Sequence, residues 1–523
     1  MAGSKQWAVP LRNIAILLLI WEVVGRLDLI ADGALPGISE ILIGLWNDRS
    51  DYPLHVWETL KASGLGFVIG NLLGVVAGVF FVLIPMSLRV FRGLNIAIFA
   101  LPPIAIAPIL SLTLSGLTPR VVLAALGCYF VTMTATVIGL SQSDSRAADL
   151  IRVYGGGNWL IMRMVQFRSA LPSILSGLRV AAPNAVLGAI LAEFGGGGRW
   201  GLGAYLLGSL GRAEPERLWG IGVVATLIAG LAYGVFALMS HRFVGASRAV
   251  TMNMSVPEKA GDGSSSPVSS LLAGAMAVLL PFLFWWAFIR LLEVPAMISK
   301  TPIGVVEYLF FSPAAQSAQE RLIAALWETL PITGVGLVCG LSFAFALAIS
   351  SRLFPGFLRA FMPVALVTQT MPLVALTPLL VLLLGRGTSL TLWVTISVTF
   401  FPAFVILAQG ISMVPRATRE LAMAYGASAW QELRIITVPA SMPYLFAATR
   451  LTVPRALLGV MIAEWLATGK GLGNLLNQSR GYMDYGMIWT VAALSVILAV
   501  VFYQLVVVVE RRVLQRMGMS TAE

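Results

Sequence analysis

Long apolar runs separated by short polar loops dominate the sequence. Most of these runs carry no charged residue and approach or exceed the roughly 20 residues that a helix needs to cross a bilayer. The uncharged runs cover residues 62–88, 93–119, 121–143, 218–240, 329–351, 360–385, 387–415 and 485–509. Charged runs at 173–195 and 444–466, and first runs at 10–26 and 272–292, complete the pattern. It predicts an all-α polytopic membrane protein with about twelve transmembrane helices.

The two halves of the chain repeat each other. Trp57–Leu60 and Trp327–Leu330 both read WETL, and Gly201–Gly203 and Gly471–Gly473 both read GLG, at a separation of 270 positions. LPPIAIAPIL matches MPLVALTPLL at the same separation, which pairs Pro102 with Pro372 and Pro108 with Pro378. An even number of spans per repeat predicts two parallel, pseudo-symmetric six-helix halves.

Composition shifts mark the joint between the halves. The segment 244–270 is rich in Ser, Gly and Pro and lacks aromatic residues, which is typical of a flexible linker. We therefore predict a first half at 1–243, with its core at about 56–241. The second half covers 271–523, with its core at about 326–512.

Composition excludes a soluble protein. Of the 523 residues, 58% are hydrophobic and only 11% are charged, whereas soluble domains carry about a quarter charged residues. The net charge of +11 lies mostly in short loops, which indicates membrane orientation and not nucleic-acid binding. Arg and Lys flank the spans on one side, and this side also holds the loops 144–172 and 412–443. The sequence thus predicts that these loops, the linker and both termini are cytoplasmic.

The loop RELAMAYGASAWQELRIITVPASMP, from Arg419 to Pro443, is the most polar stretch in its surroundings, and a second copy runs from Ala148 to Pro172. Glu420-Leu-Ala-Met-Ala-Tyr-Gly426, followed by a helical stretch and Val-Pro439, resembles the EAA motif of bacterial ABC-importer permeases. The flanks RLTVPRALLGVMIAEWLATGKGLGNLL and MPLVALTPLLVLLLGRG resemble the nitrate, sulfonate, taurine and thiamine-precursor branch of that family. The resemblance covers both halves.

The resemblance implies the type I ABC-importer permease fold and several partners. Two cytoplasmic ABC ATPase subunits, which would hold the ATP and Mg, would dock on the two loops. A solute-binding protein would deliver a small solute outside, and the chain would lie in the bacterial plasma (inner) membrane without a cofactor of its own. The residues that match the motif are Asp149, Tyr154, Gly155, Pro172, Glu420, Ala422, Tyr425, Gly426, Pro439 and Pro443.

The first loop departs from the motif. Asp149 stands where Glu420 does, Ile151 replaces Ala422, and Arg168 replaces Pro439. The docking surfaces are therefore predicted to be unequal, and they could meet two different ATPases or one homodimer. In the second loop we expect Leu421, Ala422 and Tyr425 to face the partner, with Arg419, Glu432 and Arg434 in solvent.

Polar residues in the spans are candidates for the pathway. Glu193 and Glu464 end equivalent helices, where each either lines a gate or is bonded to nearby loop amides. Arg455, whose repeat partner is Asn184, lies near mid-depth and either attracts an anion or pairs within the protein. Pro102, Pro108, Pro372 and Pro378 break helical bonds within a span, which shapes either the pathway or the packing.

No nucleotide-binding loop, catalytic triad or metal cluster is found in the sequence, so the chain is predicted to be a transport subunit and not an enzyme. The alternative class is an ion-coupled secondary transporter with parallel repeats. That class predicts ionisable residues at the middle of several spans, and few are found here.

Overall fold

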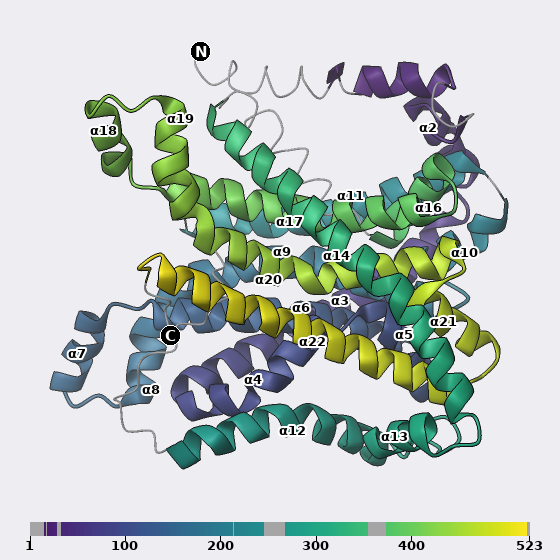
Figure 1. Ribbon diagram of the computed structural model, residues 1–523, viewed down its shortest axis with the longest axis horizontal. Helices are drawn as coiled ribbons and strands as arrows, with labels where there is room; N and C mark the ends of the chain where they lie inside the picture. Colours follow the sequence, from purple (N-terminus) through teal and green to yellow (C-terminus); the bar gives the residue numbers. More distant parts are fainter. Residues whose placement is uncertain are drawn as a thin grey trace. The chain divides into compact units, whose positions relative to one another are not determined.

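The computed structural model describes residues 15–16, 18–28, 33–212, 214–244, 267–353 and 373–519, and these residues form helices joined by short loops (Figure 1). No strand occurs among them. The helices are α2 (Ile38–Asn47), α3 (Tyr52–Leu83), α4 (Pro85–Ala100), α5 (Pro103–Thr113), α6 (Thr118–Ser141), α7 (Ser145–Val153), α8 (Asn158–Ile161), α9 (Phe167–Gly196), α10 (Leu202–Ser209), α11 (Pro215–Val244), α12 (Pro267–Leu291), α13 (Pro302–Phe310), α14 (Ala315–Leu353), α16 (Leu373–Leu384), α17 (Thr388–Met413), α18 (Arg416–Ala424), α19 (Ala429–Glu432), α20 (Val438–Ala463), α21 (Gly471–Gly481) and α22 (Tyr485–Arg516).

Within the described residues, nine helices are long and apolar enough to cross a membrane, and a bent pair brings the number to ten. The all-α polytopic fold is thereby confirmed. Two of the about twelve predicted spans, 10–26 and 360–385, lie partly outside the described residues, as does most of the linker 244–270. Short π-helical stretches, Met162–Gln166 and Leu433–Thr437, join α8 to α9 and α19 to α20 as continuous spans.

The prediction of one continuous span at 93–119 is wrong. This segment belongs to two helices, α4 and α5, whose axes differ in direction by 96°. The break falls at Leu101 and Pro102, and Pro103 follows at the start of α5. Leu101 and Pro102 each precede a proline, which disfavours the helical conformation, and both have an extended backbone, with ψ of 118° and 113°. Pro102 therefore starts a new helix instead of kinking one, whereas Pro108 and Pro378 lie inside α5 and α16.

Glycines at every fourth position let α3 pack closely on α6. A Cβ atom added to Gly74 would lie 2.8 Å from the carbonyl oxygen of Tyr129, and one added to Gly70 would overlap the backbone of Ala125. Gly66 and Gly78 complete this stripe, which lets the two backbones approach as small residues do in membrane bundles. The second half repeats the stripe in α14 as Gly336, Gly340, Ala344 and Ala348.

Contacts group the chain into two compact units, each of which combines the core of one half with outer elements of the other. One unit comprises residues 59–197, 228–321 and 478–523, and the other comprises the remaining residues up to 477. In the first of these units α9 packs along α6, and α12 of the second half packs on α4 of the first, with Gly93 against the backbone of Ala277. In the other unit α20 packs along α17.

Two tryptophan contacts recur in the repeats. The indole of Trp219 donates to the carbonyl oxygen of Ala34 at 3.1 Å, and that of Trp489 donates to Ile298 at 2.9 Å. Trp219 also contacts Trp21, with ring centroids 5.3 Å apart, and Trp489 contacts Trp285 at 5.6 Å. Trp219 and Trp489 are 270 positions apart, but the residues that they contact are 264 positions apart, Ala34 with Ile298 and Trp21 with Trp285. The first helices of the two halves therefore correspond at a separation of 264 positions, and the cores at 270.

Candidate coupling and pathway sites

The second EAA-like loop folds into two short helices joined by a tight turn. Helix α18 ends in a turn in which the N–H of Gly426 bonds the carbonyl of Met423 at 2.9 Å, and that of Ala427 bonds Ala422 at 3.0 Å. This is the Schellman pattern, and it requires the positive φ of +84° that Gly426 adopts. The hydroxyl of Ser428 then caps α19 by accepting from Gln431 N–H at 3.3 Å.

The first loop has the same geometry. The N–H of Gly155 bonds Arg152 and that of Gly156 bonds Ile151, each at 2.9 Å, and Gly155 has a φ of +76°. Asp149 forms an exposed ion pair of 2.7 Å with Arg152, which has no counterpart in the second loop because Met423 stands at the position of Arg152. The turn is therefore retained although the charges differ.

Large apolar side chains at equivalent positions of the two loops project into solvent. Tyr154 is 84% exposed and Tyr425 is 86% exposed, although each lies directly before the glycine of its turn. Trp159 and Trp430, at the start of α8 and α19, are also exposed. Large apolar side chains are mostly buried in proteins, so each loop presents an exposed apolar surface of the kind that binds a partner.

The remaining residues of the motif occupy varied positions. Glu420 is exposed and Ala422 is half-buried. Pro439 lies in the first turn of α20, and Pro443 and Pro172 lie inside α20 and α9. The helices continue through these two positions after the π-helical stretches, so the prolines do not mark a break between loop and span.

The expectation that Glu432 lies in solvent is wrong. Its side chain is buried and accepts a hydrogen bond of 2.8 Å from the hydroxyl of Thr437. Thr437 lies five residues later, within the π-helical stretch, whose wider turn brings the two side chains together. Arg434 is exposed, as expected, and Arg419 is half-buried.

Glu464 is held inside the protein by two donors. Its carboxylate, 2% exposed, accepts from the hydroxyl of Thr329 at 2.7 Å and from the N–H of Gly473 at 2.9 Å. The oxygen of Thr329 in turn accepts from the N–H of Leu472 at 2.9 Å. The threonine of WETL, the carboxylate that ends α20 and the amides that begin α21 thus form one network.

The first half contains the same pair. The hydroxyl of Thr59 lies 2.9 Å from both oxygens of Glu193, and both residues are fully buried. For Glu464, the sequence left two alternatives, a role in a gate or bonding to nearby loop amides. The hydrogen bond from the N–H of Gly473 favours bonding to loop amides. Sequence reasoning did not identify the two threonines, although the repeated WETL motif pointed to them.

Arg455 and Asn184 occupy equivalent positions on α20 and α9, and both are half-buried. The amide of Asn184 donates a long bond of 3.4 Å to the carbonyl of Gly127. Arg455 has no hydrogen bond or ion pair with any residue that the structure describes. Pro102, Pro108 and Pro378 are buried, and Pro372 lies outside the described residues.

Comparisons with known proteins agree with this architecture. The family model for the binding-protein-dependent transport system inner membrane component matches residues 70–250 and again residues 336–515. The riboflavin transport system permease protein of Chloroflexus aurantiacus is 28% identical over 240 residues, which cover 45% of this chain and 87% of that protein. The formylaminopyrimidine transport permease protein of Halalkalibacterium halodurans is 31% identical, over 35% of this chain and 68% of its own length.

The taurine transport system permease protein of Escherichia coli is 23% identical, over 45% of this chain and 84% of that protein. Each relative thus matches less than half of this chain but most of its own length, in agreement with two fused permease units. These findings confirm the transport class over the ion-coupled alternative. The chain belongs to the family of binding-protein-dependent transport system inner membrane components, and it is a multi-pass, non-enzymatic permease subunit of an ABC importer that carries a small solute.

Proposed function

We propose that this permease is driven by two ATPase subunits that dock on the α7–α8 and α18–α19 loops, and that an external solute-binding protein supplies its substrate. The observation that carries the docking is the pair of exposed tyrosines, Tyr154 and Tyr425, each set by the same glycine turn. Burial of such a side chain in a partner groove removes a large apolar area from water, which stabilises the complex.

The glycine turns supply the rigid geometry that force transmission needs. Each turn joins a short amphipathic helix to a helix that continues without a break into a span, α8 into α9 and α19 into α20. Movement of a docked subunit would therefore be carried directly into a membrane helix. ATP binding would favour the outward-open state, and hydrolysis would restore the inward-open state.

The placement in the membrane follows from the charges. Both docking loops carry several arginines, such as Arg163 and Arg434, which favour the cytoplasmic side. We place both termini on that side and the chain in the bacterial inner membrane. The GLG segments and helices α10 and α21 then lie at the outer face, where a binding protein would deliver solute.

Arg455 favours a solute with an anionic group. It lies on a helix that is mostly buried inside the protein, so lipid does not surround it, and the described residues offer it no counter-ion. A guanidinium in such a position attracts a carboxylate or sulfonate strongly. Relatives named for taurine and for aliphatic sulfonates make a sulfonate the first class to test, with riboflavin and formylaminopyrimidine as the alternatives.

Replacement of Tyr425 by Arg tests the docking. The variant is expected to insert normally, to lose copurification with the ATPase and to lose ATP-dependent uptake in vesicles, because a charge replaces the apolar anchor. Tyr482→Arg is the matched control for copurification with the ATPase, since Tyr482 is 82% exposed but lies on a loop before α22, outside both docking loops. Wild-type copurification of the Tyr425 variant would contradict docking at α18.

A further inference from the structure

Helix α2 is fixed against the start of α11 by one of its faces. Ile41 is buried, and Gly44 lies so close to Glu216 that a Cβ atom on the glycine would come within 3.2 Å of the Cβ of the glutamate. Asp48, at the end of α2, forms hydrogen bonds with the guanidinium of Arg217, the one to Nε at 2.6 Å. The helix is therefore held in one orientation and does not swing freely.

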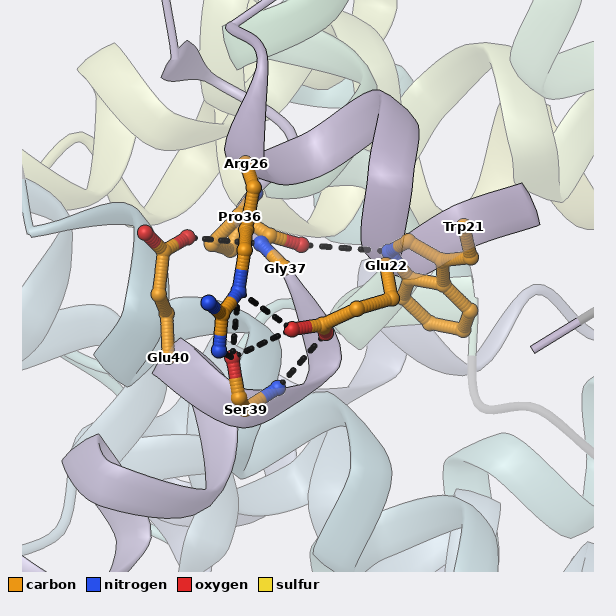
Figure 2. Close-up of polar contacts among 7 residues, drawn as sticks. All are labelled: Trp21, Glu22, Arg26, Pro36, Gly37, Ser39 and Glu40. Carbon is orange, nitrogen blue, oxygen red and sulfur yellow. Dashed lines mark hydrogen bonds and ion pairs between the residues drawn. The ribbon is translucent and has the colours of Figure 1, made fainter. Parts of the chain in front are cut away.

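The beginning of α2 is fixed by a polar cluster (Figure 2). The carboxylate of Glu22 accepts from the N–H of Ser39 at 2.9 Å and from its hydroxyl at 2.6 Å, and Arg26 donates to both Glu22 and Ser39. The indole of Trp21 donates to the carbonyl of Pro36 at 3.1 Å. These contacts connect the preceding helix, over residues 18–26, to the first turn of α2.

Helix α13 is the counterpart of α2 in the second half, 264 positions later. It packs on the start of α22, where the ring of Tyr308 lies against Gly486 and its hydroxyl donates to Asp484 at 3.0 Å. Tyr308 stands at the position of Gly44, and Gly486 stands at the position of Glu216. The same contact is thus made with the small and the large residue exchanged, so each copy of the helix is held against the start of the last span of its half, α11 or α22.

The opposite face of each helix is apolar and exposed. On α2 it consists of Leu42 and Trp46, one turn apart, with Ile43 beside them. The equivalent residues of α13, Val306 and Phe310, are also exposed. Neither helix is long enough to cross a bilayer, since a span needs about 20 residues.

Both helices are joined by short links to the spans that follow them in sequence. Hydrogen bonds from Asp51 N–H to Asp48 and from Ala315 N–H to Ser312, of 2.9 and 3.0 Å, fold the links to α3 and α14 into turns. The exposed apolar surface of α3 begins at Leu54 and Trp57, directly after its link. Trp327 is exposed at the position of α14 equivalent to Trp57, and tryptophan is enriched at the membrane–water boundary.

We propose that α2 and α13 are interfacial helices that lie along the bilayer surface, with Leu42, Trp46, Val306 and Phe310 in the boundary between lipid headgroups and acyl chains. The occupant of both apolar faces is lipid, because each helix is joined by a short turn to a membrane span whose early exposed residues include a tryptophan, Trp57 or Trp327, the residue type enriched at the membrane–water boundary. Trp46 also carries Arg49 stacked 4.8 Å from its ring centre, which places a cation at headgroup level above an apolar anchor. Their site lies outside the pathway and the docking loops.

Spin labels on single cysteines test this in the full chain in lipid nanodiscs, after Cys128 and Cys339 are replaced by Ala. Labels at positions 42 and 306 are expected to collide readily with oxygen and several-fold less with a water-soluble nickel complex than labels at Ser50 and Gln316, which are exposed polar controls. Their depth should correspond to the roughly 5–10 Å of interfacial helices.

Two outcomes would overturn the proposal. Ready collision of the 42 and 306 labels with the nickel complex would show that the faces lie in water. Protection from both reagents would show that protein covers them, for example another copy of the chain or, when it is added, a solute-binding protein. Because one label replaces one exposed side chain, folding is checked by the monodispersity of each labelled variant before the measurement.

Discussion

Thr329 donates a hydrogen bond of 2.7 Å to the carboxylate of Glu464, and Thr59 makes the equivalent contact with Glu193 in the other half at 2.9 Å. The pair joins the helix that carries WETL to the end of the helix that begins near the docking loop. Both carboxylates are shielded from solvent, which favours a structural role over direct contact with solute. This arrangement leads to the first prediction.

Replacement of Thr329 by Val should destabilise the protein by about 1–3 kcal/mol, because Glu464 loses a donor and the N–H of Leu472 loses its acceptor inside the protein. Thr329→Ser keeps the hydroxyl and should retain most of the stability. Thermal unfolding of the purified variants, followed by loss of the monodisperse peak, measures the difference. Equal melting temperatures for the Val and Ser variants would show that the network contributes little.

The close packing of α3 on α6 predicts a sharp difference between two glycines of one helix. A Cβ atom at Gly70 would overlap the backbone of Ala125, which cannot move aside, so Gly70→Ala should destabilise the bundle by about 1–3 kcal/mol. At Gly64 nothing lies within 4 Å of an added Cβ, and Ala there should be neutral or slightly stabilising, because it favours helix. Thermal unfolding tests the pair, and a neutral Gly70→Ala would contradict the packing.

The sequence predicted those features that depend on long runs and repeated motifs. Apolar runs identified the spans, and the 270-residue separation identified the duplication. The bend at Pro102 was missed because run length does not show whether a proline kinks a helix or ends it. Glu432 was misplaced because its partner, Thr437, is reached only through a π-helical stretch that residue periodicity does not reveal.

The outer helices were missed for a different reason. α2 and α13 share exposed positions and packing faces but almost no residue identities, as the exchange of Gly44 for Tyr308 shows. A helix that is apolar on most sides also gives no periodic signal of its buried face. The sequence also did not show that each compact unit combines the core of one half with outer helices of the other, because this grouping depends on contacts between residues far apart in sequence.

The ion pair of Asp48 and Arg217 predicts a pH-dependent contribution to stability. The guanidinium holds the pKa of Asp48 below its ordinary value of about 3.9 by hydrogen bonding to the carboxylate. The ion pair therefore stabilises the protein fully above the pKa that Asp48 has in the unfolded chain. This stabilisation is lost as the pH falls through the lower pKa that Asp48 has in the folded protein. Wild type should exceed Asp48→Asn by about 1–2 kcal/mol at pH 6–8, a value between those of exposed and buried pairs.

The advantage of wild type over Asp48→Asn should shrink below about pH 4, where the carboxylate takes up a proton. Melting temperatures measured from pH 3.5 to 8 in one detergent give the curve. Glu214 also contacts Arg217, at 2.8 Å, so the variant retains one ion pair and should remain folded. A difference that is constant across this range would contradict a contribution from the charge of Asp48.

Arg455 allows a prediction that separates binding from stability. Arg455→Gln removes a charge for which the described residues offer no counter-ion, so the variant should be at least as stable as wild type. For a solute with a sulfonate or carboxylate group, loss of a charge-assisted bond of about 1.4 kcal/mol or more should raise the KM for ATP-dependent uptake at least about tenfold. Arg455→Lys keeps the positive charge but lacks the planar guanidinium that donates two parallel hydrogen bonds, and it should raise the KM less than Arg455→Gln does. Uptake of an anionic solute with an unchanged KM in the Gln variant would remove Arg455 from the pathway, whereas a strong loss of stability would indicate that it pairs within the protein.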